Sequence, residues 1–226
     1  LFVQNVAPTV AITGGLTVSE GANVALGANV TDPGSADTRT YLWHVVAGNG
    51  QVIADGTAST FNFVPVDNGS YSVTLTVTDK DGGQTFKQAT VTVNNVVPTV
   101  SIGGVPGGVV EGQQLDLTAI VTDPGSADTH TYLWQVSANN GQVVPNGTGS
   151  AFSFTPTDNG SYTVTLTVTD DDTGAGSRQI VLVVSNAVPA IALTGGAQVD
   201  EGTPFTLNLG SITDPGVDVI TQIIVN

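Results

Sequence analysis

The sequence lacks cysteine and methionine, and only four of its 226 residues are Lys or Arg, against 19 Asp and Glu. Without cysteine the chain cannot form a disulfide framework, a thiolate nucleophile, a zinc ribbon or an iron–sulfur cluster. Four cationic side chains are too few for the counterion displacement that nucleic-acid binding requires, or for a polybasic membrane anchor. We therefore expect neither nucleic acid nor an anionic membrane surface as a partner.

Long apolar runs are also missing. No stretch approaches the roughly 18 to 20 apolar residues of a membrane helix, and the first residues show no basic segment followed by an apolar one. We expect no direct membrane insertion, with any export signal outside this sequence. Because 40% of the residues are hydrophobic and only 10% are charged, the net charge of -15 is not that of a disordered acidic tail.

Two long segments occur twice. TDPGSADTRTYLW (31–43) returns as TDPGSADTHTYLW (122–134), and DNGSYSVTLTVTD (67–79) returns as DNGSYTVTLTVTD (158–170), with a constant offset of 91 residues. A period of this length corresponds to a complete small domain rather than to a solenoid unit. We predict four segments: the tail of a preceding repeat (1–4), two complete repeats (5–94 and 95–185) and an incomplete third repeat with strands A to C only (186–226).

Within each repeat the apolar residues alternate with polar ones. Tyr71, Val73, Leu75 and Val77 alternate with Ser and Thr, which indicates a strand with one buried face, and turn dipeptides such as Asn68-Gly69 separate the strands. No segment has a helical period. About seven short strands in roughly 90 residues, with a Trp on the third, predict an all-β fold of tandem immunoglobulin-like β-sandwiches with strands A, B, C, C′, E, F and G.

Three motifs of these repeats resemble the polycystic-kidney-disease-type (PKD) domains and related bacterial Ig-like repeats. They are Asn-x-x-Pro at the start, TDPGSAD before a Tyr-x-Trp strand, and Gly-Ser-Tyr-x-Val-Thr-Leu-Thr-Val-Thr-Asp near the end. The family usually follows the Trp with Asp-Phe-Gly-Asp-Gly, whereas His44 follows Trp43 here and Gln135 follows Trp134. The resemblance covers both complete repeats and the third, and it implies an extracellular protein, secreted or at a bacterial cell surface, in which such domains are spacers or adhesin modules.

The acidic residues recur from repeat to repeat, whereas the cations do not. In the predicted strand order, the acids of the B–C and F–G loops lie at one end of a sandwich and those of the A–B and E–F turns lie at the other. Domains stacked end to end would bring the two sets together. Carboxylates about 4 Å apart repel by roughly 4 kcal/mol at an effective dielectric near 20, and calcium accepts six to eight oxygen ligands from flexible loops.

We therefore predict Ca²⁺ as a cofactor that rigidifies the array, an arrangement that resembles the joints of cadherins although no cadherin motif is present. The predicted ligands are the recurring acids and the Asn residues beside the repeat boundaries: Asn5, Glu20, Asp32, Asp37, Asp67, Asp79, Asp81, Asn94, Asn95, Glu111, Asp123, Asp128, Asp158, Asp170, Asp172, Asn186, Glu201, Asp214 and Asp218.

Structural roles are the alternatives for the same residues. Asp67 precedes a Tyr in the pattern of an immunoglobulin tyrosine corner. Asp32 before Pro-Gly, and Asp79 and Asp81 beside a Gly-rich hairpin, fit turns in which Asp caps its own backbone. Glu20 fits a solvated edge residue. No loop has EF-hand spacing, so the sequence leaves both interpretations open.

Catalysis is not predicted. The two His residues occupy non-equivalent positions, since His44 matches Gln135 and His130 matches Arg39, and no nucleophile has a base beside it in the pattern. Trp43 and Trp134 fall at inward positions, which favours core residues over sugar-stacking platforms.

The first hypothesis for function is an extracellular structural or adhesive rod module with interdomain calcium. Its partners would be neighbouring repeats and a surface protein or glycan. The alternatives are a calcium-independent spacer or carbohydrate-binding accessory module of a secreted hydrolase, and a strand-exchanging subunit of an extracellular polymer that self-assembles through the third repeat.

Overall fold

The computed structural model describes residues 3–196 and 198–223. The regular structure of these residues is β-strand, and they contain no helix long and apolar enough to cross a membrane. The chain divides into two compact units. The first comprises Leu1–Thr99, Thr122–His130 and Thr169–Ala175, and the second comprises Val100–Val121, Thr131–Val168 and Gly176–Asn226. The first unit therefore holds the first repeat together with three segments of the second, residues 95–99, 122–130 and 169–175.

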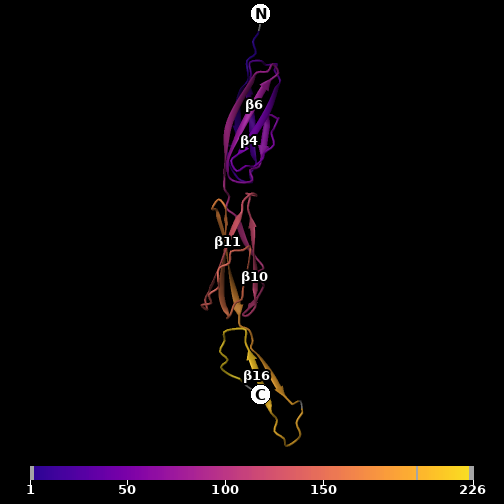
Figure 1. Cartoon of the computed structure of the whole chain (residues 1–226), viewed down its shortest axis with the longest axis vertical. Coiled ribbons are helices and arrows are strands. Elements are labelled where there is room, and N and C mark those ends of the chain that lie inside the picture. Colours follow the sequence, from indigo (N-terminus) through magenta and orange to yellow (C-terminus); the bar gives the residue numbers. More distant parts are fainter. Residues whose placement is uncertain (1–2, 197, 224–226) are drawn as a thin grey trace. The chain divides into compact units, whose positions relative to one another are not determined.

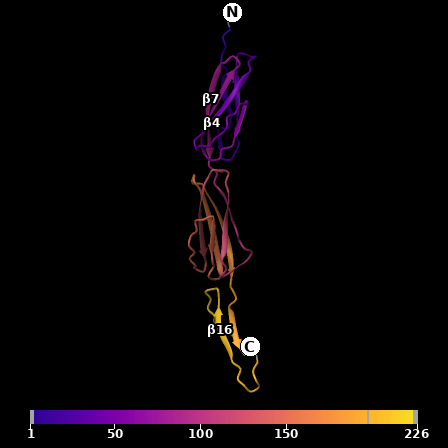
Figure 2. The same cartoon turned by 45° about the vertical axis from the view of Figure 1, so that its right-hand side comes forward.

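The first repeat is a sandwich of two sheets, which confirms the predicted fold class. One sheet has the order β1-β3-β5 and the other the order β2-β7-β6-β4; β4 and β6 lie side by side in Figure 1, and β4 and β7 are labelled in Figure 2. The strands are β1 (Thr9–Gly14), β2 (Thr17–Ser19), β3 (Val24–Thr31), β4 (Arg39–Ala47), β5 (Thr60–Phe63), β6 (Gly69–Asp79) and β7 (Gln84–Asn94).

The period-two pattern places the core between the sheets. Along β6, Tyr71, Val73, Leu75 and Val77 have no exposed surface, while the Ser and Thr residues between them face outward. Burial of a Val or Leu side chain contributes about 1.5–3 kcal/mol. Trp43 is also fully buried, and its indole nitrogen donates a hydrogen bond of 2.9 Å to the carbonyl oxygen of Ala58. Trp43 is therefore a core residue, as its position in the sequence predicts.

The strand order differs from the expected one in two places. Residues 48–59 form no C′ strand, and their one β-bridge joins Gly56 to Trp43. Strand A instead divides into β1, which pairs with β3, and β2, which runs parallel to β7. Gly14 ends β1 with a φ of 125°, and a Cβ at this position would lie 2.3 Å from the carbonyl oxygen of Ala25. The close backbone approach explains why a glycine stands where the chain changes sheets.

The second repeat is built in the same way. Its sheets have the orders β12-β10-β8 and β11-β13-β14-β9, and Trp134 is fully buried with its ring stacked 5.4 Å from that of Phe152. The strands are β8 (Thr99–Gly103), β9 (Val109–Val110), β10 (Leu115–Thr122), β11 (His130–Ala138), β12 (Ala151–Phe154), β13 (Gly160–Asp170) and β14 (Ala175–Ser185).

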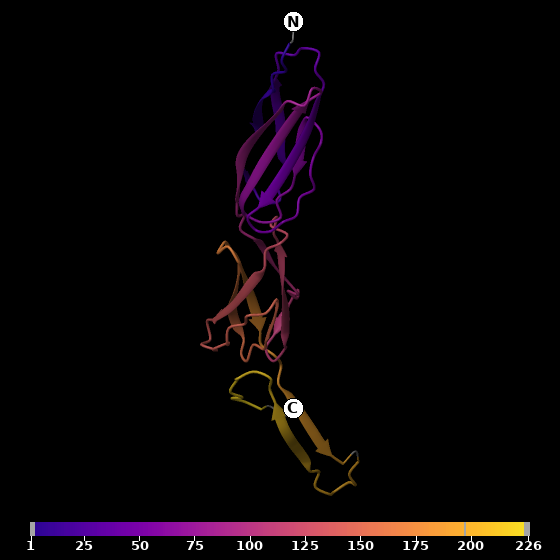
Figure 3. The same ribbon diagram turned by 45° about the horizontal axis from the view of Figure 1, so that its top comes forward.

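The third repeat contributes one antiparallel pair, β15 (Ala190–Gly195) and β16 (Leu207–Thr213), drawn in orange and yellow in Figure 3. These strands correspond to A and B of the complete repeats. The expected strand C is not formed as far as residue 223, and residues 224–226 lie outside the described part of the chain.

Candidate metal centre

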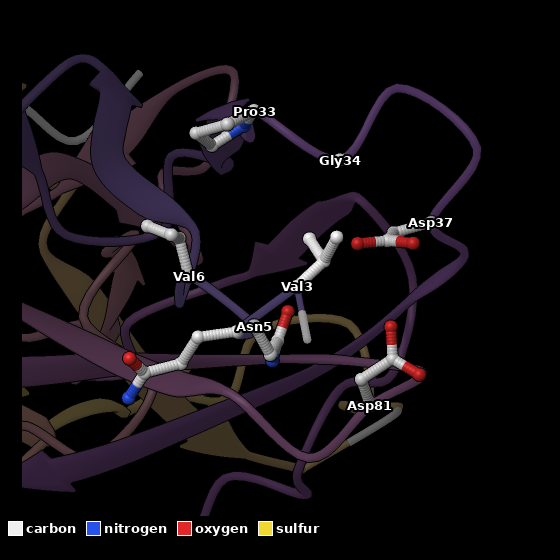
Figure 4. A pocket seen from close by; sticks show the side chains of 8 residues that line it. Val3, Asn5, Val6, Pro33, Gly34, Asp37 and Asp81 are labelled. Atoms are coloured by element: carbon white, nitrogen blue, oxygen red, sulfur yellow. The ribbon is translucent and has the colours of Figure 1, made fainter. Parts of the chain in front are cut away.

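The first cluster of carboxylates lies at one end of the first repeat and is called the Asp79 cluster. It consists of Asp32 and Asp37 from the loop after β3 and Asp79 at the end of β6, with one carboxylate oxygen of each within 4.8 Å of the others. Asn5 and Asp81, also predicted for this end, line a shallow pocket with Asp37 (Figure 4). The predicted gathering of the B–C loop, the F–G loop and Asn5 is therefore present.

The oxygens of Asp79 are occupied by hydrogen bonds from the protein. Oδ1 accepts bonds from the backbone N–H groups of Asp81 at 2.9 Å and Gly83 at 2.8 Å, and Oδ2 accepts one from the Asn5 side chain at 3.0 Å. These donors, the Asn5 amide first among them, hold the pKa of Asp79 below its ordinary value. The two backbone contacts are those of a turn that Asp79 caps with its own side chain, which is the alternative interpretation of this residue.

Two cations of the first repeat face the Asp79 cluster, and neither contact follows from the recurring residues of the sequence. Lys80 Nζ lies 2.6 Å from Asp37 and 2.8 Å from Asp81, and Arg39 Nε lies 4.0 Å from Asp32. The hydrogen bonds to Asp37 and Asp81 raise the pKa of Lys80. The position of Lys80 between two acids was a signal for these contacts in the sequence. Because no lysine recurs at the equivalent position of the second repeat, Lys80 did not stand out.

Glu20 lies near the other end of the first repeat, after β2, and is the most deeply buried acid described, with 1% of its surface exposed. Oε1 accepts a hydrogen bond of 2.6 Å from the backbone N–H of Val96, whereas Oε2 is buried and has no hydrogen-bond partner. The next residue, Gly21, has a φ of 69°, and a Cβ there would lie 2.7 Å from Pro124. The interpretation of Glu20 as a solvated edge residue is therefore wrong.

Within the first compact unit, Glu20 belongs to a second collection of acids, which we call the Glu20 centre. Two groups of three carboxylates each bring one oxygen per residue within 4.8 Å, and Asp128 belongs to both groups. Both oxygens of Asp128 are buried without a hydrogen-bond partner. The groups are Glu20 with Asp123 and Asp128, and Asp67 with Asp128 and Asp172.

Burial and mutual repulsion dominate the electrostatics of the Glu20 centre. Burial, followed by the charges of Glu20, Asp123 and Asp67, raises the pKa of Asp128 to about 7. Burial is also the first cause of the raised pKa values of Glu20 and Asp67. In the described part of the chain, the ion pairs of Lys and Arg do not include these carboxylates, so their ionised forms lack an ammonium or guanidinium counter-charge.

The residues that neutralise the Asp79 cluster are replaced in the Glu20 centre. By the 91-residue offset, Arg39 corresponds to His130 and Lys80 corresponds to Asp171. His130 Nε2 lies 2.9 Å from Asp123 Oδ2, whereas Asp171 adds a further carboxylate, which accepts a hydrogen bond from the Thr129 N–H at 2.9 Å. Asp171 did not stand out in the sequence because no acid occupies the equivalent position of the first repeat.

The second compact unit contains an equivalent collection, the Glu111 centre, made of Glu111, Asp214 and Asp218. Glu111 is 2% exposed; its Oε1 accepts a hydrogen bond of 2.7 Å from the Ala187 N–H, and its Oε2 is buried without a partner. A Cβ at the following residue, Gly112, would lie 2.4 Å from Pro215. Glu111 in the second compact unit thus has the same kind of environment as Glu20 in the first.

Other predicted ligands have structural contacts or lie apart. The carbonyl oxygens of Asp67 and Asp158 lie 3.0 and 2.9 Å from the hydroxyls of Tyr71 and Tyr162, as in a tyrosine corner. Asp170 accepts a bond from the Asn95 amide at 3.0 Å, the Asn94 carbonyl accepts one from the Glu20 N–H, and Asn186 lines a shallow pocket with Asp214 and Asp218. Glu201 is exposed and belongs to none of the carboxylate groups found in the described residues.

The donor set of the two centres fits a hard divalent cation. The groups found in both centres consist of carboxylates, and each centre contains a buried glutamate oxygen that has no hydrogen-bond partner. Calcium prefers such oxygen ligands and tolerates their irregular geometry. The chain's own residues would hold the ion directly through these carboxylates, and the ion would supply the missing positive charge.

Comparison with known proteins identifies the repeats. The sequence matches the PKD domain over residues 5–94 and again over residues 95–184. The chain belongs to the PKD domain family. Domains of this family occur in extracellular proteins and are typically non-catalytic modules, so the chain is a tandem PKD repeat module.

Two solved structures illustrate the similarity. The PKD1 domain of the Vibrio cholerae metalloprotease PrtV is 32% identical, covers 39% of this chain and is itself covered over 99% of its length, with a TM-score of 0.31. Three N-terminal domains of the bacteriophage RB49 outer capsid protein Hoc are 20% identical over 92% of this chain and 70% of that one, with a TM-score of 0.34. No curated protein matches the sequence.

Proposed function

We propose that this PKD array is a non-catalytic structural module of an extracellular protein, stiffened by divalent cations that bind at the Glu20 and Glu111 centres. Calcium is the cation that the all-oxygen donor sets favour. The observation that carries the proposal is the recurrence of one unusual feature. In each compact unit a glutamate that is at most 2% exposed keeps one oxygen without a partner, among carboxylates that repel it.

The hydrogen bond that each of these glutamates accepts explains how a bound cation would stiffen the chain. Glu20 Oε1 accepts a hydrogen bond from the N–H of Val96, which lies in the segment that joins β7 to β8. Glu111 Oε1 accepts one from the N–H of Ala187, which lies in the segment before β15. A cation on the other oxygen would fix the same carboxylate to loop acids further along the chain. Linkers between consecutive domains otherwise leave relative domain motion free, so ligation would restrict that motion.

Small-angle X-ray scattering of the whole chain in calcium and in chelator tests this function. We expect the maximum dimension to be larger, and the distance distribution narrower, in calcium. The double variant Glu20→Gln, Glu111→Gln should lose most of that difference, whereas the control Asp116→Asn, which removes an exposed acid outside the centres, should keep it. Identical curves with and without calcium would falsify the stiffening role.

A further inference from the structure

Asp128 holds an unusual position among the acids of the first compact unit. It is the one residue shared by the two carboxylate groups of the Glu20 centre. Its counterpart in the second unit, Asp218, belongs to a single group with Glu111 and Asp214 among the described residues. The two centres therefore differ in the number of places at which three carboxylates converge.

Both oxygens of Asp128 are available for ligation. Each is buried and neither has a hydrogen-bond partner. Asp79 shows the contrast, because backbone N–H groups and the Asn5 amide occupy its oxygens. A carboxylate with two free buried oxygens between two groups of acids has the donor arrangement of a bridging ligand.

Each of the two groups also contains an unpartnered oxygen of its own. In the first, Glu20 is 1% exposed and its Oε2 has no partner. In the second, the buried Oδ1 of Asp67 has none. A buried carboxylate oxygen without a donor or a cation is strongly unfavourable, so each group independently calls for a positive charge.

Charge counting favours two ions over one. The Glu20 centre contains five carboxylates, and the equivalents of Arg39 and Lys80 are His130 and Asp171. One divalent ion would leave a formal charge of about -3 on the five carboxylates when all are ionised, and two would leave about -1. Pairs of divalent ions about 3.5–4 Å apart, held by shared ligands, are a recognised arrangement in proteins.

We propose that the Glu20 centre binds two divalent cations bridged by the carboxylate of Asp128, one held with Glu20 and Asp123 and the other with Asp67 and Asp172. The Glu111 centre binds one. Calcium's remaining coordination positions would be filled by backbone carbonyls and water. This inference rests on the proposed function, because it specifies the stoichiometry of the same centre.

Native mass spectrometry of the whole chain at saturating calcium counts the ions directly. We expect Asp128→Asn to lose two ions relative to the unmodified chain, and the matched variant Asp218→Asn to lose one. Glu20→Gln and Asp172→Asn should each lose one, and together two. Asp172 is exposed, so its variant keeps the test valid if substitution of a buried acid impairs folding.

The outcomes separate this inference from the proposed function. If Asp128→Asn loses one ion and Asp172→Asn loses none, the bridged pair is overturned, while a single stiffening cation at the Glu20 centre stands. If neither Asp128→Asn nor Glu20→Gln loses an ion, both the pair and the proposed cation at that centre are overturned. Circular dichroism of each variant establishes that the β-structure is retained.

Discussion

The loops after β3 and β6 form the Asp79 cluster, and the equivalent loops of the second repeat contribute Asp123, Asp128 and Asp172 to the Glu20 centre. The negative charge of these loops is balanced differently in the two repeats. At the Asp79 cluster, Lys80 contacts Asp37 at 2.6 Å, and the pKa of Asp79 is lowered by its hydrogen bonds. At the Glu20 centre the equivalent of Lys80 is Asp171, and the pKa values of Glu20 and Asp128 are raised. One position in the loop after β6 or β13 thus determines whether a fixed ammonium group balances the acids.

The largest effect is expected from moving the ammonium group into the Glu20 centre with Asp171→Lys. Because Lys80 reaches Asp37, a lysine at 171 should reach Asp128, the equivalent of Asp37. It would occupy the place of a cation and add its positive charge beside the remaining ligands. We expect calcium affinity at this centre to fall at least about tenfold, or about 1.4 kcal/mol, measured by isothermal titration calorimetry.

The same variant should be more stable than the unmodified chain in chelator, since the lysine relieves repulsion among the acids. Asp171→Asn is the matched control, because it removes the carboxylate without adding a cation and should retain most calcium binding. Unchanged calcium affinity in Asp171→Lys would show that the Lys80 position does not govern the choice between ammonium and ion.

A smaller effect is expected from the reverse change, Lys80→Ala. Without the ammonium group, Asp37 and Asp81 would lose the cation that contacts them. In chelator the first repeat should then melt at a slightly lower temperature, because a partly exposed ion pair stabilises only weakly. Calcium should restore the loss by binding at the Asp79 cluster in place of the ammonium group. Thermal melting in calcium and in chelator measures both effects.

Lys87→Ala is the control for this experiment, because Lys87 is exposed on β7, away from the cluster. It should melt like the unmodified chain in both conditions. A Lys80→Ala protein whose melting temperature does not respond to calcium more than that of Lys87→Ala would contradict the role assigned to the ammonium group.

The sequence predicted the fold class because period-two alternation and turn dipeptides are local signals. Burial of Tyr71, Val73, Leu75 and Val77 follows directly from them. It also predicted which acids would lie at the same end of a sandwich, since that depends only on the strand order. The split of strand A was not predictable in the same way, because it depends on how closely the backbone at Gly14 approaches Ala25.

The sequence could not predict which carboxylate oxygens have hydrogen-bond donors, and the reason is physical. Asp79 and Glu20 both recur and both precede glycine-containing turns, but backbone N–H groups satisfy one and leave an oxygen of the other without a partner. That difference arises from the placement of backbone donors after folding. Recurrence gives no signal for Lys80 and Asp171, because the charge at this position reverses between the two repeats.

The dependence of stability on pH in chelator compares the two clusters most directly. Asp128 has a pKa of about 7, above the ordinary 3.8, so between these values the folded chain binds more protons than the unfolded chain. The free energy of unfolding should therefore fall as pH rises from about 4 to about 7. Asp79, with its lowered pKa, acts in the opposite direction, since its contribution is present above about pH 4 and is lost as pH falls further.

Melting temperatures at pH 3 to 8 should show a shallower decline toward neutral pH for Asp128→Asn, whereas Asp79→Asn should keep that decline and lose part of the drop in acid. If Asp128→Asn keeps the full decline between pH 4 and 7, the unfavourable ionisation of Asp128 is not what distinguishes the Glu20 centre from the Asp79 cluster.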